Sequence, residues 1–150
     1  MKVGGSLITK KSEPMAADAA AMATVARALS SAKNLIVVHG GGSFGHSVAM
    51  SRGLSSSSVS RDAASAAATR LAMHELSLLF IRELASAGLH PFLFHSSLPD
   101  SPEFWDRSAS LVRGLLEMGM TPLTHGDVGL TSGGFRIVGG DEICLRLAER

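Results

Sequence analysis

Apolar positions along the chain alternate between short continuous runs and longer stretches with helical spacing. Residues 34–39 (NLIVVH) form a short apolar run between Asn and Gly, which is typical of a strand covered on both faces. Residues 90–95 (HPFLFH) have the same character and predict another strand. The opening residues KVGGSLIT begin as a strand that breaks at Gly4 and Gly5. We therefore expect three short strands before the last third of the chain.

Three stretches next to these runs have the composition and spacing of helices. Residues 16–32 are rich in helix formers, with apolar residues three and four positions apart. Residues 61–87 predict a long helix and residues 104–118 an amphipathic one, and Gly88 and Gly119 stand where these helices should end. The apolar residues that we expect on the inward side of the long helix are Leu71, Leu78, Leu79 and Ile81.

The last thirty residues predict a hairpin and a final helix. The segments 120–130 and 133–138 are joined through Ser-Gly-Gly, which supplies the positive φ that a tight turn needs. Gly140 and Asp141 begin a final helix. The order β-α-β-α-β-α-β, followed by the hairpin and the helix, predicts an α/β fold class: a three-layer α/β/α sandwich with a mainly parallel sheet.

Composition narrows the class of protein. The 150 residues suffice for one domain that removes roughly 70% of the unfolded chain's surface from water. A formal net charge of +1 creates no overall field that would attract nucleic acid or an anionic membrane. The single cysteine, Cys144, excludes an internal disulfide framework, and no apolar run suits a secretory signal or a membrane span. We therefore expect a cytoplasmic protein that binds neither nucleic acid nor membranes.

Two glycine clusters, each directly after a predicted strand, carry the candidate chemistry. Residues 39–46 (HGGGSFGH) place three glycines where consecutive backbone N–H groups can turn toward one anion. A helix starting near Ser43 would direct its positive dipole end to the same place, with His46 one turn further. The other cluster adds cations, and its residues are Lys2, Gly4, Gly5, Ser6, Lys10 and Lys11. Two such loops at one edge of a parallel sheet predict a site for more than one phosphate.

Other interpretations of these residues stay open at this point. GGGSFG also satisfies the dinucleotide pattern G-x-G-x-x-G, and Asp62 has about the spacing of its ribose-binding acid, although it stands in a serine-rich loop before a helix. Tight turns alone would also explain the glycines, and a solvated surface pair would explain Lys10 and Lys11. Histidines for which a structural role suffices are His39, His74, His90 and His95. No spacing of histidine, thiol and carboxylate predicts a metal site.

Four motifs follow one another along nearly the whole chain: KVGGS, HGGGSFGH, HGDVGL and GGFRIVGGDEI. Together they resemble the amino acid kinase superfamily, and SFGH after HGGG is most similar to isopentenyl phosphate kinases, with fosfomycin kinases next. The resemblance implies ATP-dependent phosphorylation of a small phosphorylated or phosphonate acceptor by in-line transfer. Its preferred form is isopentenyl phosphate to isopentenyl diphosphate, in isoprenoid biosynthesis. The alternatives are a fosfomycin kinase-like resistance enzyme and a non-catalytic, truncated or split binding module.

The resemblance also implies roles for individual residues. Lys2 would neutralise the transferred phosphoryl group, Asp141 would orient Lys2, and His46 would bind the phosphate of the acceptor. Residues implied in ATP or phosphate binding are Gly5, Ser6, Lys11, Gly40, Gly41 and Gly42. Gly45 would line the space between donor and acceptor. Apolar residues that we expect around a short hydrocarbon tail are Met50, Leu54, Ala67, Leu71 and Met73, with Met50 and Leu71 as substrate-binding residues.

The same resemblance implies the cofactor, the partners and the extent of the domain. ATP with Mg²⁺ would be the donor, and no protein-held metal is expected. Members of the superfamily continue for roughly another domain's length. We therefore expect residues 1–150 to be a single N-terminal acceptor-binding domain, with the nucleotide-binding half and its adenine site absent. A homodimer or a complementing C-terminal half would then be the protein partner.

Overall fold

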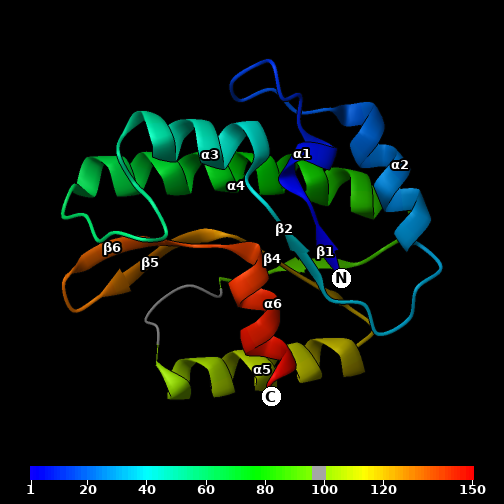
Figure 1. Cartoon of the computed structure of the whole chain (residues 1–150). Helices are drawn as coiled ribbons and strands as arrows, with labels where there is room; N and C mark the ends of the chain where they lie inside the picture. Colours follow the sequence, from blue (N-terminus) through cyan, green and yellow to red (C-terminus); the bar gives the residue numbers. More distant parts are fainter. Residues whose placement is uncertain (96–100) are drawn as a thin grey trace.

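The computed structural model describes residues 1–95 and 101–150, and Figure 1 shows the course of the chain. The sheet and its helices alternate along the sequence as the hydrophobic pattern predicts. The elements in chain order are β1 (Lys2–Val3), α1 (Gly5–Ile8), α2 (Ala19–Leu29), β2 (Val37–His39), α3 (Gly42–Ser51), α4 (Ala63–Ser86), β3 (Pro91–Leu93), α5 (Pro102–Glu117), β4 (Thr121–His125), β5 (Asp127–Thr131), β6 (Gly134–Val138) and α6 (Gly140–Ala148).

The central sheet has four parallel strands in the order β1-β2-β4-β3. In its register, Val38 of β2 stands between Lys2 of β1 and Thr124 of β4. Because all four strands run in one direction, their carboxyl ends lie at one edge, and the loops that follow β1, β2 and β4 meet there. The prediction of a mainly parallel sheet is therefore confirmed.

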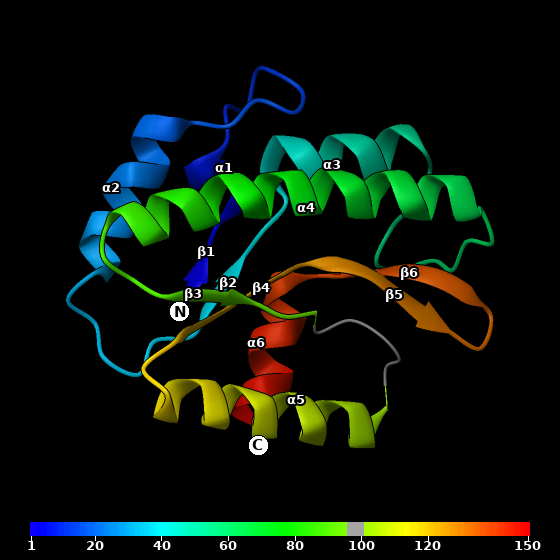
Figure 2. The ribbon, with the colours of Figure 1, turned by 180° about the vertical axis from the view of Figure 1, so that it is seen from behind.

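Helices cover both faces of this sheet. Figures 1 and 2 show α1 to α4 on one face and α5 and α6 on the other. Neighbouring residues of β2 belong to different cores, since successive side chains of a strand point to opposite faces. Val37 is buried with Phe80 of α4, whereas Val38 is buried with Trp105 of α5 and Ile143 of α6. This alternation confirms the predicted three-layer α/β/α sandwich.

The first strand ends earlier than the apolar residues of KVGGSLIT suggest. The chain turns at Gly4 and continues as the short helix α1, which ends at Ile8. Ile8 is buried in the core beneath α2 and α4. Its burial explains the apolar character of the segment without a longer strand, so the break predicted at the glycines is confirmed and the helix after it is an addition.

The long helix α4 buries a different side from the one expected. Leu71 and Leu78 are 59% and 54% exposed, whereas Leu79 and Ile81 are partly buried against the core. The residues that α4 buries are Ser65, Ala66, Thr69, Ala72, Met73, Leu76, Ser77, Phe80 and Leu84. Two of them, Thr69 and Ser77, have hydroxyl groups that donate to the helix backbone, as Ser77 Oγ does to the carbonyl of Met73 at 2.8 Å. Because of these polar residues, the buried side of α4 resembles an exposed side in the sequence. The prediction that Leu71 and Leu78 face inward was therefore wrong.

The predicted hairpin forms as the antiparallel pair β5 and β6. Val128 of β5 packs against Leu54 and against Ala66 of α4 in a small third core. The serine-rich loop before α4 is joined to the same hairpin, because Ser60 exchanges two backbone hydrogen bonds with Phe135, at 2.8 and 2.7 Å. This loop and hairpin therefore form one wall beside the carboxyl edge of the sheet.

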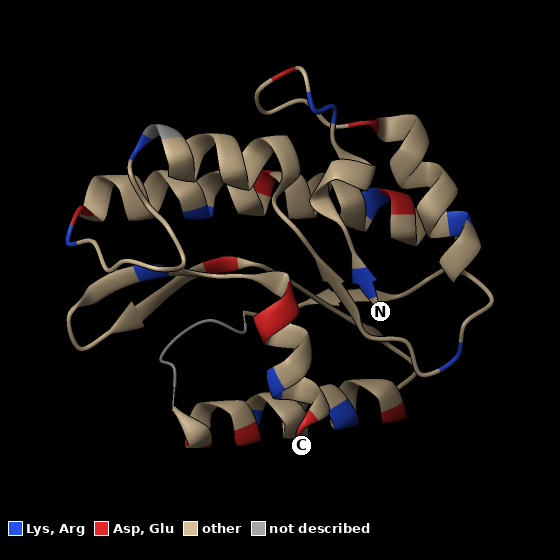
Figure 3. Cartoon of the chain, viewed as in Figure 1, with Lys and Arg blue, Asp and Glu red and all other residues tan. Residues whose placement is uncertain are grey.

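Charged residues are distributed over both helical layers and the loops, with basic and acidic positions interspersed (Figure 3). This distribution agrees with the small formal net charge of +1. None of the described helices combines the length and the hydropathy that crossing a membrane requires.

Candidate functional site

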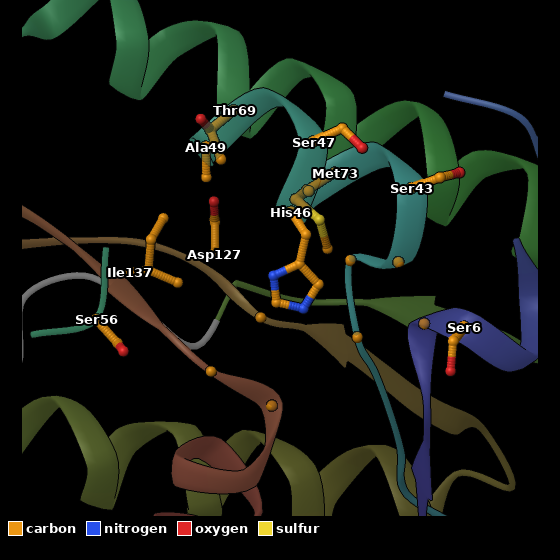
Figure 4. A pocket seen from close by; sticks show the side chains of 18 of the residues that line it. Ser6, Ser43, His46, Ser47, Ala49, Ser56, Thr69, Met73, Asp127 and Ile137 are labelled. Carbon is orange, nitrogen blue, oxygen red and sulfur yellow. The ribbon is translucent and has the colours of Figure 1, made fainter. Parts of the chain in front are cut away.

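A cavity of about 740 Å³ lies at the carboxyl edge of the sheet, between the two glycine loops, α3, the hairpin and the start of α6 (Figure 4). Parallel strands place their ligand sites at this edge. The predicted site residues that line the cavity are Lys2, Gly5, Ser6, Lys11, Gly40, Gly41, Gly42, Gly45, His46, Met50 and Asp141. The fold thus gathers into one hollow residues that are up to 139 positions apart.

The two glycine loops lie backbone against backbone. A Cβ on Gly5 would overlap the backbone nitrogen of Gly42, and a Cβ on Gly40 would lie 2.9 Å from the nitrogen of Gly5. Gly42 also has a φ of +48°, a left-handed conformation that is costly for residues with a Cβ. The glycines are therefore required by this close approach, in addition to any contact with an anion.

Hydrogen bonds within the protein already use some of the backbone donors expected to face an anion. Helix α3 begins at Gly42, close to the predicted start at Ser43. The N–H of Ser43 donates to Oγ1 of Thr9 at 3.0 Å, and the N–H of Gly40 donates to the carbonyl of Val3 at 2.9 Å. The expectation that the first turn of α3 as a whole offers free N–H groups is therefore wrong at Ser43. Gly5, Gly41 and Gly42 remain the candidate backbone donors.

Lys2 and Asp141 form an ion pair at the mouth of the cavity, with 2.6 Å between Nζ and Oδ2. Lys2 comes from β1, and Asp141 stands in the first turn of α6. The positive end of the α6 dipole favours a carboxylate at this position. The structure thus brings together the lysine and the acid that the motifs pair, and their catalytic roles stay predictions.

His46 extends from α3 into the cavity beside Met73, as Figure 4 shows. His39, seven residues earlier, is fully buried at the end of β2 and lies outside the cavity lining. Its Nδ1 donates to the carbonyl of Gly40 at 3.1 Å, and its Nε2 lies 2.9 Å from Oγ of Ser77. Burial, followed by repulsion from His125, lowers the pKa of His39 to about 3. His39 is therefore neutral and structural, whereas His46 is available to a ligand.

Several candidates do not reach the cavity. Ala67 and Leu71 are exposed on α4, whose residues Thr69 and Met73 line the hollow instead. Leu71 lies two residues from each of these, about 200° around the helix, and so points away. The assignment of Leu71 to the substrate pocket was therefore wrong. Lys10 also lies apart, on the surface, with its Nζ 3.6 Å from Oε1 of Glu13.

Asp62, the acid of the dinucleotide interpretation, caps α4. Its Oδ1 accepts hydrogen bonds from the N–H groups of Ala64 and Ser65 at 3.0 and 3.1 Å. The hydroxyl of Ser65 donates to the other carboxylate oxygen, and these hydrogen bonds lower the pKa of Asp62. The capping role thus explains Asp62, which was the acid that had supported a dinucleotide-binding site.

Many residues of the cavity wall were not predicted from the sequence, among them Thr69, Asp127, Ile137 and Val138. Asp127 is buried, and its Oδ2 lies 3.2 Å from Nη1 of Arg70 on α4. The motif HGDVGL contains this aspartate, so its position after a strand was the available signal. Nothing in the sequence indicated that Arg70 would be its partner.

A family model described as the amino acid kinase family matches residues 1–150. Among curated relatives, the chain is 33% identical over 154 residues to an isopentenyl phosphate kinase of Thermoplasma acidophilum, covering 99% of this chain and 61% of that protein. It is 38% identical over 157 residues to one of Haloferax volcanii, covering 99% and 63%. The chain thus spans about three fifths of the length of these relatives.

Solved structures give the same result. A crystal structure of an isopentenyl phosphate kinase substrate complex superimposes with a TM-score of 0.86 and 30% identity, over 99% of this chain and 62% of that one. A product complex of the T. acidophilum isopentenyl phosphate kinase superimposes with a TM-score of 0.87 and 30% identity, over 99% and 63%. The predicted fold is therefore that of these kinases over nearly all of this chain.

Proposed function

The chain belongs to the amino acid kinase family, and from this premise we propose that it is the acceptor-binding part of a small-molecule phosphate kinase. The proposed reaction transfers the terminal phosphoryl group of ATP to isopentenyl phosphate, with isopentenyl diphosphate as the product. The observation that carries the proposal is the convergence of Lys2, Asp141 and His46 with both glycine loops in one cavity. Its relatives named above support the choice of acceptor.

In the proposed step, a phosphate oxygen of the acceptor attacks the terminal phosphorus of ATP, and the bond from that phosphorus to the ADP oxygen breaks. Such transfer depends mainly on in-line positioning and on stabilisation of charge. Lys2 would stabilise the charge on the transferred group while Asp141 holds its ammonium in place. His46 would donate a hydrogen bond to the acceptor phosphate. The reaction needs no side-chain nucleophile.

Mg²⁺ would enter with the phosphates of ATP. It prefers several oxygen ligands and usually retains waters. Among the described residues of the cavity wall, the carboxylates are Asp127 and Asp141, and each is already close to a cation, Arg70 or Lys2. We therefore assign Mg²⁺ to the nucleotide rather than to a protein cage. Lys11, which also lines the cavity, would face the same phosphates.

The hydrocarbon tail of the acceptor would lie between α3, α4 and the hairpin. Apolar side chains from these segments that line the cavity are Met50, Leu54, Met73, Ile137 and Val138. In Figure 4, Met73 lies beside His46, and Ile137 lies on the side of His46 away from Ser6, in the direction that a tail attached to a bound phosphate would take. This arrangement favours an acceptor with a polar head and a short apolar end.

The test is a calorimetric titration of the 150-residue chain with isopentenyl phosphate and, separately, with fosfomycin. We expect isopentenyl phosphate to bind, and His46→Ala to weaken its binding by about tenfold or more, since a hydrogen bond to a charged group contributes roughly 1.5–3 kcal/mol. His90→Ala is the matched control, because His90 is an exposed histidine outside the cavity. Binding of fosfomycin alone would favour the alternative acceptor, and binding of neither would overturn the proposal.

A second assay separates a kinase from a module that only binds. Chain and acceptor are incubated with ATP and Mg²⁺, alone and within a longer protein that supplies the remaining two fifths of a relative's length. Lys2→Ala should abolish most of the transfer while leaving acceptor binding detectable. Transfer that is unaffected by Lys2→Ala would show that the role assigned to Lys2 is wrong.

A further inference from the structure

Three histidines and an aspartate meet beside the cavity, at the ends of β3 and β4. His74 comes from α4, His95 follows β3, His125 ends β4, and Asp127 begins β5. One potential ligand atom from each of the four lies within 4.8 Å of the others. We call these four residues the histidine cluster. Its members come from segments that are far apart in the sequence, so only the fold creates it.

Two nitrogens of the histidine cluster are buried without a hydrogen-bond partner in the described part of the chain. They are Nε2 of His74 and Nε2 of His125. His125 is only 2% exposed, and its Nδ1 lies 3.0 Å from the carbonyl oxygen of Gly126. Since a carbonyl can only accept, the proton of the neutral ring is on Nδ1 and the lone pair is on Nε2. Buried polar atoms normally have partners, so this lone pair indicates a missing electrophilic ligand.

The rings are close enough to share one ion. Ring centroids are separated by 5.0 Å between His74 and His95, 5.7 Å between His74 and His125, and 6.0 Å between His95 and His125. Burial is the main cause that lowers the pKa of both His74 and His125. The spacing of the three rings therefore carries the argument for one shared ion.

Asp127 brings a negative charge to the histidine cluster, but this carboxylate already forms an ion pair with Arg70, whose Nη1 lies 3.2 Å from Oδ2. The N–H of Val128 donates to Oδ1 at 2.7 Å. The guanidinium opposes a second cation through its charge, and the carboxylate attracts one. We therefore assign the principal ligands to the three imidazoles, with Asp127 contributing charge at the edge of the cluster.

We propose that the histidine cluster binds one divalent transition-metal ion of the Zn²⁺ class, at a site separate from the phosphate cradle. Three imidazole nitrogens with one carboxylate suit Zn²⁺, Co²⁺ or Ni²⁺, whereas Mg²⁺ and Ca²⁺ prefer oxygen ligands. The ion links α4, the end of β3 and the junction of β4 with β5. Asp127 belongs to the histidine cluster and also lines the cavity, so the ion stiffens the cavity wall at this residue.

The test is a titration of the 150-residue chain, free of any histidine tag, with Zn²⁺ by calorimetry and with Co²⁺ by visible absorption. We expect saturable binding of one ion near pH 7, and a Co²⁺ spectrum of the intense tetrahedral type. His95→Ala should weaken binding by about tenfold or more, since even residues that only support a ligand contribute 10–100-fold. His95 is exposed, so its removal leaves no buried cavity.

His74→Gln is the second variant, and His90→Ala is the matched control because His90 is an exposed histidine outside the cluster. Circular dichroism of each variant establishes that it is folded. Binding that is weakened in both cluster variants and unchanged in His90→Ala supports the site. Absence of a saturable one-ion phase in the wild-type chain, or equal affinity in all folded variants, overturns it. These measurements are independent of phosphate binding and of kinase activity.

Discussion

Two separate features of the structure require glycine at position 42. Its φ of +48° disfavours any residue with a Cβ, and the added atom would also overlap Oγ1 of Thr9. Gly53 has a comparable φ of +70°, but a Cβ there would meet nothing within 4 Å. Gly53 is therefore required only for its backbone conformation. Gly42 is required for its conformation and also for the close contact with α1 and Thr9.

We expect Gly53→Ala to lower the free energy of unfolding by about 1–2 kcal/mol, the cost of a left-handed conformation. Gly42→Ala should cost clearly more, because α1 and α3 must also move apart. Urea unfolding of both variants measures the difference, and titration with isopentenyl phosphate should show weakened binding only for Gly42→Ala. Equal losses of stability would mean that the contact between the loops contributes nothing.

His46 and His39 belong to the same motif but differ completely in environment. The strand places His39 under α4, where Ser77 and the Gly40 carbonyl satisfy it, whereas His46 stands on the side of α3 that faces the cavity. Position relative to the glycines predicted a structural role for His39, which its burial and hydrogen bonds confirm, whereas the role of His46 in binding a ligand stays a prediction. Burial supplies the physical reason, since a neutral buried ring cannot respond to an anion in the cavity.

At the scale of elements, α4 depends on its amino-terminal cap. The carboxylate of Asp62 accepts from two backbone N–H groups that the helix leaves without partners, and from the hydroxyl of Ser65. These hydrogen bonds hold the pKa of Asp62 below its usual value of 3.8. A group with a lowered pKa stabilises the folded state above that value, and the contribution is lost as the pH falls through the lowered pKa.

We expect Asp62→Ala to lower the urea midpoint near pH 7, while Asp62→Asn retains most of it because asparagine is also a good cap. Between about pH 5 and about pH 3, the wild-type chain should lose more stability than Asp62→Asn, which cannot titrate at this position. Thermal unfolding of the two proteins over this range measures the difference. Parallel pH profiles would contradict the charged cap.

At the scale of the whole molecule, an ion pair between Arg136 and Glu142 joins the hairpin to α6. Arg136 of β6 donates from Nη1 and Nη2 to the two carboxylate oxygens of Glu142, at 2.9 and 2.7 Å. Their side chains are 19% and 30% exposed, so water screens the pair only partly. This two-pronged contact fixes the hairpin wall of the cavity relative to the helix that carries Asp141.

We expect Arg136→Ala to lower the free energy of unfolding by roughly 1–2 kcal/mol, as for a partly buried, charge-assisted pair. Glu13→Ala is the control, because its pair with Lys10 is exposed on both sides and should contribute less than about 1 kcal/mol. Urea unfolding measures both. If Arg136→Ala were no more destabilising than Glu13→Ala, the pair would not hold the hairpin in place.

The sequence by itself determined the alternation of strands and helices, apart from the short helix α1, together with the parallel sheet and about half of the residues that line the cavity. It could do so because strand runs, helix spacing and glycine clusters are local features, and because parallel strands bring the loops at their carboxyl ends to one edge. Cavity residues such as His46 and Asp141 lie in such loops or directly after them. Their convergence therefore followed from topology.

Only the tertiary structure decided which side of α4 is buried, which N–H groups are already used, and where the histidine cluster forms. Leu71 was placed on the wrong side of α4 because the buried side contains serine and threonine. In the sequence these residues look like exposed polar positions, although their hydroxyl groups are buried. A structural role seemed sufficient for His74 and His95, and His125 was not singled out, because no spacing within the chain relates the three residues. Contacts between distant segments depend on strand order and helix packing, which hydrophobic patterns do not encode residue by residue.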